Sequence, residues 1–190
     1  MNVLIVYAHP NPQSFNKSIL DVVDAEFKQR GDVVRLRDLY ADDFNPVLDE
    51  AQLELQTQGD VPADVVRHQK DVAWADTITI IYPLWWFDRP AILKGWFDRV
   101  FTNGFAFSFE DGEIKGLLSG KRAMVIVTTG GTKEDFGKNA DQLTRSTTEG
   151  TLAFCGITNI VDRVFYSVPI VDDNTRQEML DELKSFIRDF

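Results

Sequence analysis

The chain is poor in cysteine and histidine, the residues that form disulfides and most zinc sites. Its 190 residues include one cysteine and two histidines. Cys155 cannot form an internal disulfide, which fits the reducing cytoplasm. His9 and His68 could complete a conventional zinc site only with carboxylates, and no metal-ligand spacing is present. We therefore expect a cytoplasmic protein without a bound metal.

The chain also lacks a long apolar stretch and an excess of positive charge, which argues against membranes and nucleic acid as partners. No apolar stretch approaches the roughly 20 residues that a membrane helix needs. The run Val3–Tyr7 lacks a basic leader, which is typical of a first strand rather than of a signal peptide. Positive charge is also scarce, since 20 basic residues face 30 acidic ones and the net charge is −10. An acidic surface repels nucleic acid and anionic membranes, so neither is expected as a partner.

Several catalytic and nucleotide-binding motifs are missing as well. The chain has no Walker loop and no G-x-G-x-x-G sequence, so a dinucleotide fold of the Rossmann type is not indicated. It also lacks a Ser-His-Asp signature. Hydrolysis by a serine nucleophile and binding of a dinucleotide through a glycine-rich fingerprint are therefore not expected.

What the chain does contain is a regular alternation of apolar runs and amphipathic segments. The predicted strands are residues 1–7, 33–36, 77–82, 123–128 and 157–166. The predicted helices are residues 15–30, 49–56, 63–75, 90–101, 141–154 and 173–190. Alternating phenylalanines at 105, 107 and 109, followed by Asp111-Gly112, predict a short hairpin.

This alternation predicts an α/β fold with a doubly wound parallel sheet and helices on both of its faces. Five strands favour the flavodoxin-like order 2-1-3-4-5. No repeat, low-complexity tract or domain boundary is visible, so residues 1–190 are expected to form one domain. Ligands of such sheets bind beyond the carboxyl ends of the strands, where the strand order reverses. The loops after the first, third and fourth predicted strands are therefore the candidate site.

The first of these loops runs from His9 to Asn16 and contains two prolines. Ser14 is a favourable N-cap, which leaves the free amides of Phe15 and Asn16 pointing outward. A helix start of this kind is a ready site for an anion, so a phosphate cradle formed by His9, Ser14, Phe15 and Asn16 is one interpretation. An ordinary capped helix is the other.

The second loop places three adjacent aromatic residues, Trp85, Trp86 and Phe87, just after a buried strand and Pro83-Leu84. A flat ring could pack against them, or they could form a hydrophobic corner or a dimer face. The third loop, Thr128–Thr132, contains a pair of glycines, which permit close backbone approach to a ligand or simply form a turn. The coincidence of the three loops at one edge of one sheet favours a shared ligand.

At these residues the chain resembles the NAD(P)H:quinone oxidoreductases of the DT-diaphorase type and their short bacterial relatives. The similarity spans nearly the whole chain, and its most specific part is Pro83–Phe101. The matching segments are Tyr7–Pro10, Ser14–Asn16, Asp38–Tyr40, Phe44–Pro46, Pro83-Leu84, Trp86-Phe87, Pro90–Phe101, Gly104–Ala106 and Thr128–Gly131.

The resemblance implies a homodimer that holds a flavin, FAD or FMN, on a flavodoxin-like sheet. It implies a ping-pong reaction in which NAD(P)H delivers hydride to flavin N5 and a quinone-like acceptor then takes two electrons. The phosphate and ribityl part would be held by His9, Ser14, Phe15 and Asn16. The ring would lie against Pro83, Leu84, Trp85, Trp86 and Phe87, and its pyrimidine edge would face Thr128, Thr129, Gly130 and Gly131. The catalytic positions would be Gly130, Gly131 and Trp86, the two glycine amides stabilising the charge of the reduced ring.

The chain departs from the mammalian enzymes of this family at their proton-sharing pair. Phe136 stands in the place of the tyrosine, and no histidine follows His68. Water or another group would then protonate the product, or the acceptor differs. Arg176 falls near the arginine that FAD-binding relatives place at the pyrophosphate, which favours FAD over FMN. A single-electron carrier and a regulatory subunit of a potassium-efflux transporter remain as alternative functions.

Overall fold

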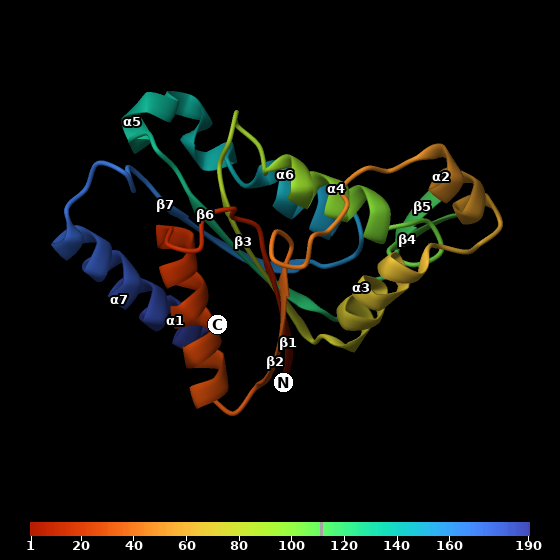
Figure 1. Cartoon of the computed structure of the whole chain (residues 1–190), viewed down its shortest axis with the longest axis horizontal. Coiled ribbons are helices and arrows are strands. Elements are labelled where there is room, and N and C mark those ends of the chain that lie inside the picture. The colour runs from red at the N-terminus through yellow and green to blue at the C-terminus, as the bar shows by residue number, and fades with distance from the viewer. Residues whose placement is uncertain (111) are drawn as a thin grey trace.

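The centre of the computed structural model, which describes residues 1–110 and 112–190, is a five-stranded parallel sheet (Figure 1). Its strands are β1 (Asn2–Tyr7), β2 (Val33–Asp38), β3 (Thr77–Pro83), β6 (Arg122–Thr128) and β7 (Asn159–Phe165). They lie in the order β2-β1-β3-β6-β7. Numbered along the parallel strands alone, this is 2-1-3-4-5, so the predicted order is confirmed. The reversal falls between β1 and β3, which pair directly.

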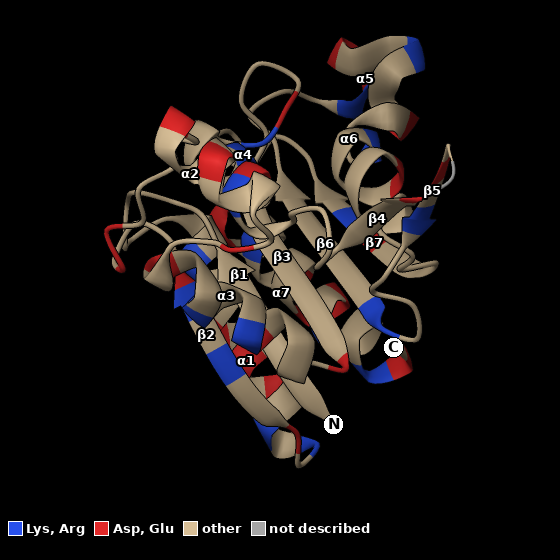
Figure 2. Cartoon of the chain, turned by 90° about the vertical axis from the view of Figure 1, so that its right-hand side faces the viewer, with Lys and Arg blue, Asp and Glu red and all other residues tan. Residues whose placement is uncertain are grey.

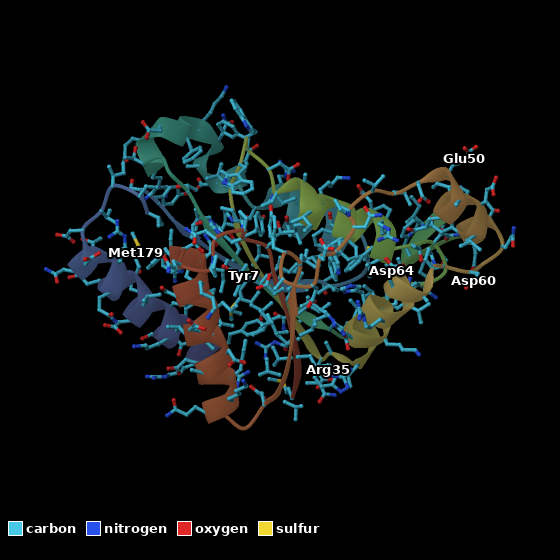
Figure 3. All side chains as sticks on the ribbon, in the orientation of Figure 1. Tyr7, Arg35, Glu50, Asp60, Asp64 and Met179 are labelled. Atoms are coloured by element: carbon cyan, nitrogen blue, oxygen red, sulfur yellow. The ribbon has the colours of Figure 1, made fainter. Side chains whose placement is uncertain are left out.

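Four helices pack on the sheet, α1 and α7 on one face and α3 and α4 on the other (Figure 1). Their bounds are Phe15–Gln29, Asp173–Asp189, Ala63–Trp74 and Ala91–Val100 respectively. Successive residues of a strand point to opposite faces, and β1 supplies both cores accordingly. Leu4 packs towards α3 and α4, whereas Tyr7 packs towards α1 and α7 and lies deep in the interior in Figure 3. Every residue of β3 is buried, as a strand covered on both faces requires.

Several further elements lie around the rim of this framework. They are α2 (Glu50–Thr57), α5 (Lys133–Phe136) and a two-stranded hairpin of β4 (Phe107–Glu110) and β5 (Glu113–Gly116). The hairpin was predicted, but it begins at Phe107 rather than Phe105. Of its predicted turn, Asp111 lies outside the described residues and Gly112 has a φ of +83°.

The predicted helix over residues 141–154 is wrong as a single element. The structure has a 3-10 helix (Gly137–Gln142), the short α6 (Arg145–Thr147) and a π-helical segment (Thr148–Ala153). Threonine hydroxyls compete with the backbone here: Thr148 donates to the carbonyl of Thr144 at 3.2 Å, and Thr151 to that of Ser146, five residues back, at 2.9 Å. Such side-chain bonds disfavour a regular α-helix, and π-helical turns often lie at functional sites.

Charged residues are spread over the ribbon in Figure 2, with basic bands along the edge strand β2. Arg35 and Arg37 of β2 both donate to the buried carboxylate of Asp71 on α3, at 2.9 and 2.6 Å. Arginines on an edge strand discourage pairing with another chain. Within the described residues, we find no helix that combines the length and apolar character needed to cross a membrane.

The segment before α2 is held against α4 by an unusually close approach at Gly95. A Cβ atom built on Gly95 would lie 2.1 Å from the carbonyl oxygen of Pro46. The same segment is tied to α4 by Arg99, whose Nη1 donates to the carbonyl of Asn45 at 2.7 Å. Glycine is therefore required at position 95 despite its poor helix propensity.

We expect Gly95→Ala to destabilise the protein by about 2 kcal/mol, since overpacking of about 1–3 kcal/mol outweighs the helix-propensity gain of up to ~1 kcal/mol. For a chain of this size the melting temperature should fall by about 4–8 °C. Gly150→Ala is the control, because its Cβ would meet its nearest neighbour at an ordinary 3.7 Å. Equal melting temperatures for the two variants would contradict the close approach.

Candidate functional site

The loops after β1, β3, β6 and β7 lie together beyond the ends of the strands, and the first residue of each of the first three loops bonds the end of the neighbouring strand. The amide of Ala8 donates to Ile81 at 3.0 Å, that of Leu84 to Thr128 at 2.8 Å and that of Thr129 to Phe165 at 2.8 Å. Each bond continues the sheet ladder by one more residue. The starts of these loops are therefore positioned by the sheet and not by local loop structure.

These four loops enclose a cavity of about 350 Å³, within the ~300–1,000 Å³ range of small-molecule sites. Its lining is His9, Phe15, Asn16, Pro83, Leu84, Trp85, Thr128, Thr129, Gly130, Val168 and Pro169. The sequence predicted all of these as site residues except Val168 and Pro169, which follow β7. The rule used for the other loops would have found them, because they too lie beyond the carboxyl end of a strand in the same sheet.

Asn16 is a deeply buried polar side chain of the cavity and is only 3% exposed. Its Nδ2 donates to the Thr128 hydroxyl at 2.7 Å, which links the start of α1 to the end of β6. Its Oδ1 is buried and finds no hydrogen-bond donor among the described residues. A buried acceptor without a donor costs about 1–3 kcal/mol, so this oxygen indicates a ligand or a water that donates to it.

His9 contributes a neutral ring to the cavity. Burial lowers the pKa of His9, and its Nδ1 accepts a hydrogen bond from the amide of Asn11 at 3.0 Å. With Nδ1 accepting, the proton of the neutral ring lies on Nε2, which is therefore a donor. The ring lies 6.1 Å from that of Trp85, so two of the loops meet at these side chains.

Ser14 has the N-cap role expected of it but does not line the cavity. Its hydroxyl accepts from the amide of Lys17 and lies 3.3 Å from the hydroxyl of Tyr7. The cap satisfies one of the free amides of α1 and leaves others at the helix start, next to Phe15 and Asn16. An anion at this end of α1 would therefore meet backbone donors and the positive end of the helix dipole.

The aromatic loop forms a tight turn that directs two of its rings away from the cavity. Trp85 and Asp88 pair through two backbone hydrogen bonds of 2.9 and 3.1 Å. Between them Trp86 and Phe87 have φ values of +53° and +61°, as in a type I′ turn. Trp86 is 99% exposed and Phe87 is 59% exposed, and neither lines the cavity. Left-handed backbone costs non-glycine residues roughly 1–2 kcal/mol each, so other contacts must hold this turn.

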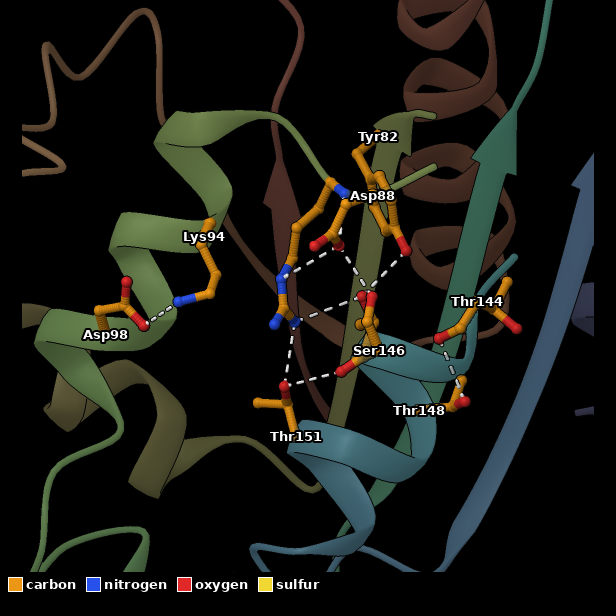
Figure 4. A network of polar contacts seen from close by, with 10 residues as sticks. Tyr82, Asp88, Lys94, Asp98, Thr144, Ser146, Thr148 and Thr151 are labelled. Carbon is orange, nitrogen blue, oxygen red and sulfur yellow. Dashed lines mark hydrogen bonds and ion pairs between the residues drawn. The ribbon is translucent and has the colours of Figure 1, made fainter. Parts of the chain in front are cut away.

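A network of polar contacts fastens the base of this turn to α6 and the π-helical segment (Figure 4). Asp88 accepts from the hydroxyl of Ser146 at 2.8 Å, and Arg89 donates to that of Thr151 at 3.0 Å. The Tyr82 hydroxyl lies 2.9 Å from that of Thr147, and burial raises the pKa of Tyr82 to about 12. These contacts connect the end of β3 with a segment more than 55 residues later.

The two glycines of the third loop differ in surroundings. Gly130 lines the cavity, and a Cβ atom built on it would meet nothing within 4 Å. A Cβ on Gly131 would instead face Asp135 at 3.2 Å and Phe136 at 3.4 Å, and Gly131 does not line the cavity. Of the pair, Gly130 is therefore the one that leaves room for a ligand.

Arg176 lies beside the cavity rather than in its lining. Its Nε donates to the carbonyl of Val168, a lining residue, at 3.1 Å. Its Nη1 pairs with Asp173 in the first turn of α7 at 2.6 Å. A guanidinium is thus anchored next to the loop after β7.

Comparison with known proteins gives consistent matches over this whole architecture. Residues 1–187 match the family described as having the flavodoxin-like fold. An uncharacterised NAD(P)H oxidoreductase of Haemophilus influenzae is 37% identical, covering 95% of this chain and 91% of its own length. Human ribosyldihydronicotinamide dehydrogenase [quinone] is 36% identical, covering 94% and 87%. The structure of an NAD(P)H:quinone oxidoreductase from Methanothermobacter marburgensis superposes with a TM-score of 0.85 at 30% identity, covering 99% and 96%.

Proposed function

Since this chain belongs to the family with the flavodoxin-like fold, we propose that it is a flavin-dependent NAD(P)H:quinone oxidoreductase. It is an oxidoreductase, as the names of its relatives support. The observation that carries the more specific proposal is the single cavity lined by residues from four loops that are distant in the sequence. Residues 1–190 would act as one flavin-binding unit.

The residues of the cavity fit a flavin in their chemistry. The buried Oδ1 of Asn16 has no hydrogen-bond donor among the described residues, and a ribityl hydroxyl of the flavin could donate to it. The start of α1 offers backbone amides to a phosphate. Pro83, Leu84 and Trp85 supply an apolar wall for a planar ring, and Gly130 leaves space against the backbone. Donors to a ring edge and apolar walls for its face are what recognition of a fused heterocycle requires.

A bound flavin would supply the redox chemistry, accepting a hydride from NAD(P)H and passing two electrons to a quinone-like acceptor in a ping-pong sequence. The protein would contribute orientation and electrostatics. The amide of Gly130, the glycine that lines the cavity, would stabilise negative charge at the ring edge. The neutral ring of His9 would donate through Nε2 without adding a fixed charge. Trp86 and Phe87, held at the rim by the strained turn, would offer aromatic faces to an incoming ring.

FAD is the flavin we propose, because Arg176 is positioned beside the cavity where a second phosphate would be bound. Arg176→Ala should weaken FAD binding by about tenfold and leave FMN binding unchanged, since only FAD has the additional phosphate and adenosine. Titration of flavin-free protein with each flavin, followed by fluorescence quenching, measures both affinities. Lys184→Ala on the same helix is the control. An equal loss for both flavins would contradict the FAD assignment.

We also propose that the protein is a homodimer. Several large apolar side chains are strongly exposed in the chain alone: Trp86, Phe87, Phe109, Ile114 and Phe154. Exposed aromatic residues in such number usually mark an interaction surface. Sedimentation of active protein at the mass of one chain would contradict this proposal.

The visible spectrum of the purified protein tests the proposed function most directly. A yellow protein that releases FAD on denaturation, and that oxidises NADH or NADPH with menadione, is the expected result. Protein that stays colourless after addition of FAD and FMN would contradict flavin binding. Protein that binds flavin but leaves NAD(P)H unoxidised with every quinone would contradict the enzymatic part alone.

A further inference from the structure

The glycine pair Gly130-Gly131 is tied at both of its ends to the loop that follows β7. Before the pair, the carbonyl of Thr129 accepts from the amide of Val168 at 3.0 Å. At the end of the pair, the carbonyl of Gly131 accepts from the amide of Ser167 at 2.9 Å. The same Gly131 carbonyl accepts a second hydrogen bond, from the Thr129 hydroxyl at 2.8 Å. Gly130 therefore lies between two carbonyl groups whose directions are fixed.

The amide of Gly130 is a free donor within this tied segment. It makes no hydrogen bond with any residue that the structure describes. Because the peptide bond is planar and trans, its N–H points opposite to the carbonyl of Thr129 in the same peptide group. The bond from Val168 to that carbonyl therefore fixes the direction of the Gly130 amide as well. Gly130 lines the cavity, so an oriented donor stands at the cavity wall.

Ser167 reaches Gly131 only through an unfavourable backbone conformation. Its φ is +58°, in the left-handed region that residues with a side chain rarely adopt. The carbonyl of Ser167 accepts from the amides of Ile170 and Val171 at 2.9 and 3.1 Å, and these bonds close a turn that holds the conformation. Ser167 itself does not line the cavity. A strained residue directly behind a candidate site is a candidate for a functional role, since strain of this kind concentrates at such sites.

We propose that Thr129 and Ser167 are positioning residues that hold the glycine pair so that the Gly130 amide stabilises a reduced flavin more than an oxidised one. This inference rests on the proposed flavin-dependent function and deepens it. Reduction adds negative charge to the ring, and a donor that is already in place stabilises this charge better than one that must reorient. Loss of either tie at the Gly131 carbonyl should therefore lower the midpoint potential of the bound flavin.

The first test replaces the Thr129 hydroxyl, with the midpoint potential of the flavin-loaded protein measured by equilibration against a reference dye. Thr129→Val keeps the branched shape and removes the donor, whereas Thr129→Ser keeps a hydroxyl. We expect Thr129→Val to bind the reduced flavin about tenfold more weakly relative to the oxidised one, which lowers the potential by about 30 mV for a two-electron couple. Thr129→Ser should restore the original potential.

Thr148→Val is the matched control for the loss of a threonine hydroxyl. This hydroxyl also donates to a backbone carbonyl, that of Thr144 at 3.2 Å, but Thr148 does not line the cavity. The control should leave the potential unchanged. A fall in Thr148→Val equal to that in Thr129→Val would mean that the potential follows general loosening of the protein, and it would overturn the proposal.

Ser167 separates positioning from a direct contact between Thr129 and the flavin. Valine is β-branched and disfavours positive φ, so Ser167→Val should move the amide away from Gly131. Glycine adopts positive φ freely, so Ser167→Gly should keep the bond. We expect Ser167→Val to lower the potential as Thr129→Val does, and Ser167→Gly to leave it unchanged. Because the Ser167 side chain is not in the cavity lining, a difference between these variants reports on the position of the glycine pair.

The melting temperature of each flavin-free variant shows whether it is folded, and the Thr129 series decides the question if Ser167→Val is not. Flavin bound at an unchanged potential in Thr129→Val would overturn this proposal and leave the proposed function standing. Protein that binds no flavin would overturn both.

Discussion

Gly130→Val is expected to reduce flavin affinity by more than about 100-fold, ~2.7 kcal/mol, with no loss of stability. Gly130 lines the cavity and is not in the left-handed region of φ, so a valine can adopt its backbone conformation. Its new Cβ would meet no protein atom within 4 Å. The branched side chain would therefore occupy space that the proposed ligand needs, and the folded protein would be unaffected.

The flavin content of the purified variant and its melting temperature in the flavin-free form are the two measurements. Gly131→Val is less informative because its side chain would press on Asp135 and Phe136 and disturb α5. Leu117→Val, at a half-exposed site remote from the cavity, is a neutral comparison. Normal flavin content in Gly130→Val would show that the ligand does not approach this loop.

Stability is expected to fall by roughly 3 kcal/mol between pH 7 and pH 4 on account of His68 alone. This side chain is 1% exposed, and its Nδ1 accepts a hydrogen bond from Trp96 Nε1 at 3.2 Å. Burial, with the nearby charges of Arg37 and Arg67, lowers the pKa of His68 to about 4. Protonation in the folded state would place a charge in the core and replace the acceptor with a second donor.

The sign follows from proton counting. The pKa of histidine in the unfolded chain is about 6.5, so between pH 6.5 and 4 the unfolded state binds more protons than the folded one. Stability therefore rises with pH through this window. The contribution is fully present above about pH 6.5 and is lost progressively as the pH falls to about 4. At ~1.36 kcal/mol per pKa unit, the difference between the two pKa values corresponds to about 3 kcal/mol.

Urea unfolding of the original protein and of His68→Asn at several pH values from 7 to 4 measures this contribution. Asparagine can still accept from Trp96 but cannot titrate, so the variant should be less stable at pH 7 and less sensitive to acid. Taking the difference between the two proteins cancels the carboxylates that also titrate at low pH. Parallel pH profiles would mean that His68 does not carry the acid sensitivity.

The aromatic turn shows where sequence reasoning reached its limit. The segment Leu84–Asp88 contains no glycine or asparagine, the residues that favour positive φ values, yet Trp86 and Phe87 both adopt them. The contacts that fasten this turn come from Ser146 and Thr151, which are about 60 residues away. Positive φ at large aromatic residues is a cost that only such tertiary contacts can offset. The sequence therefore located the loop but not the direction of its rings.

The segment after β6 shows a second limit. Apolar spacing over residues 141–154 predicted one helix, because periodicity reports which residues are buried and not which hydrogen-bond register the backbone uses. The hydroxyl of Thr151 bonds the carbonyl five residues back, and this local competition shifts the helix into the π register. In so short a segment, the spacing of apolar residues cannot distinguish an α-helix from a π-helix.

By itself, the sequence determined the parallel sheet, its strand order and the loops that meet at its carboxyl edge. These follow from local apolar runs, from alternation of strands with helices and from the handedness of crossovers, all of which are encoded in neighbouring residues. Only the tertiary structure decided that Gly130 rather than Gly131 opens the cavity, that Val168 and Pro169 complete its wall and that Trp86 and Phe87 lie outside its lining. Those outcomes depend on side chains brought together from distant parts of the chain, and no local pattern records them.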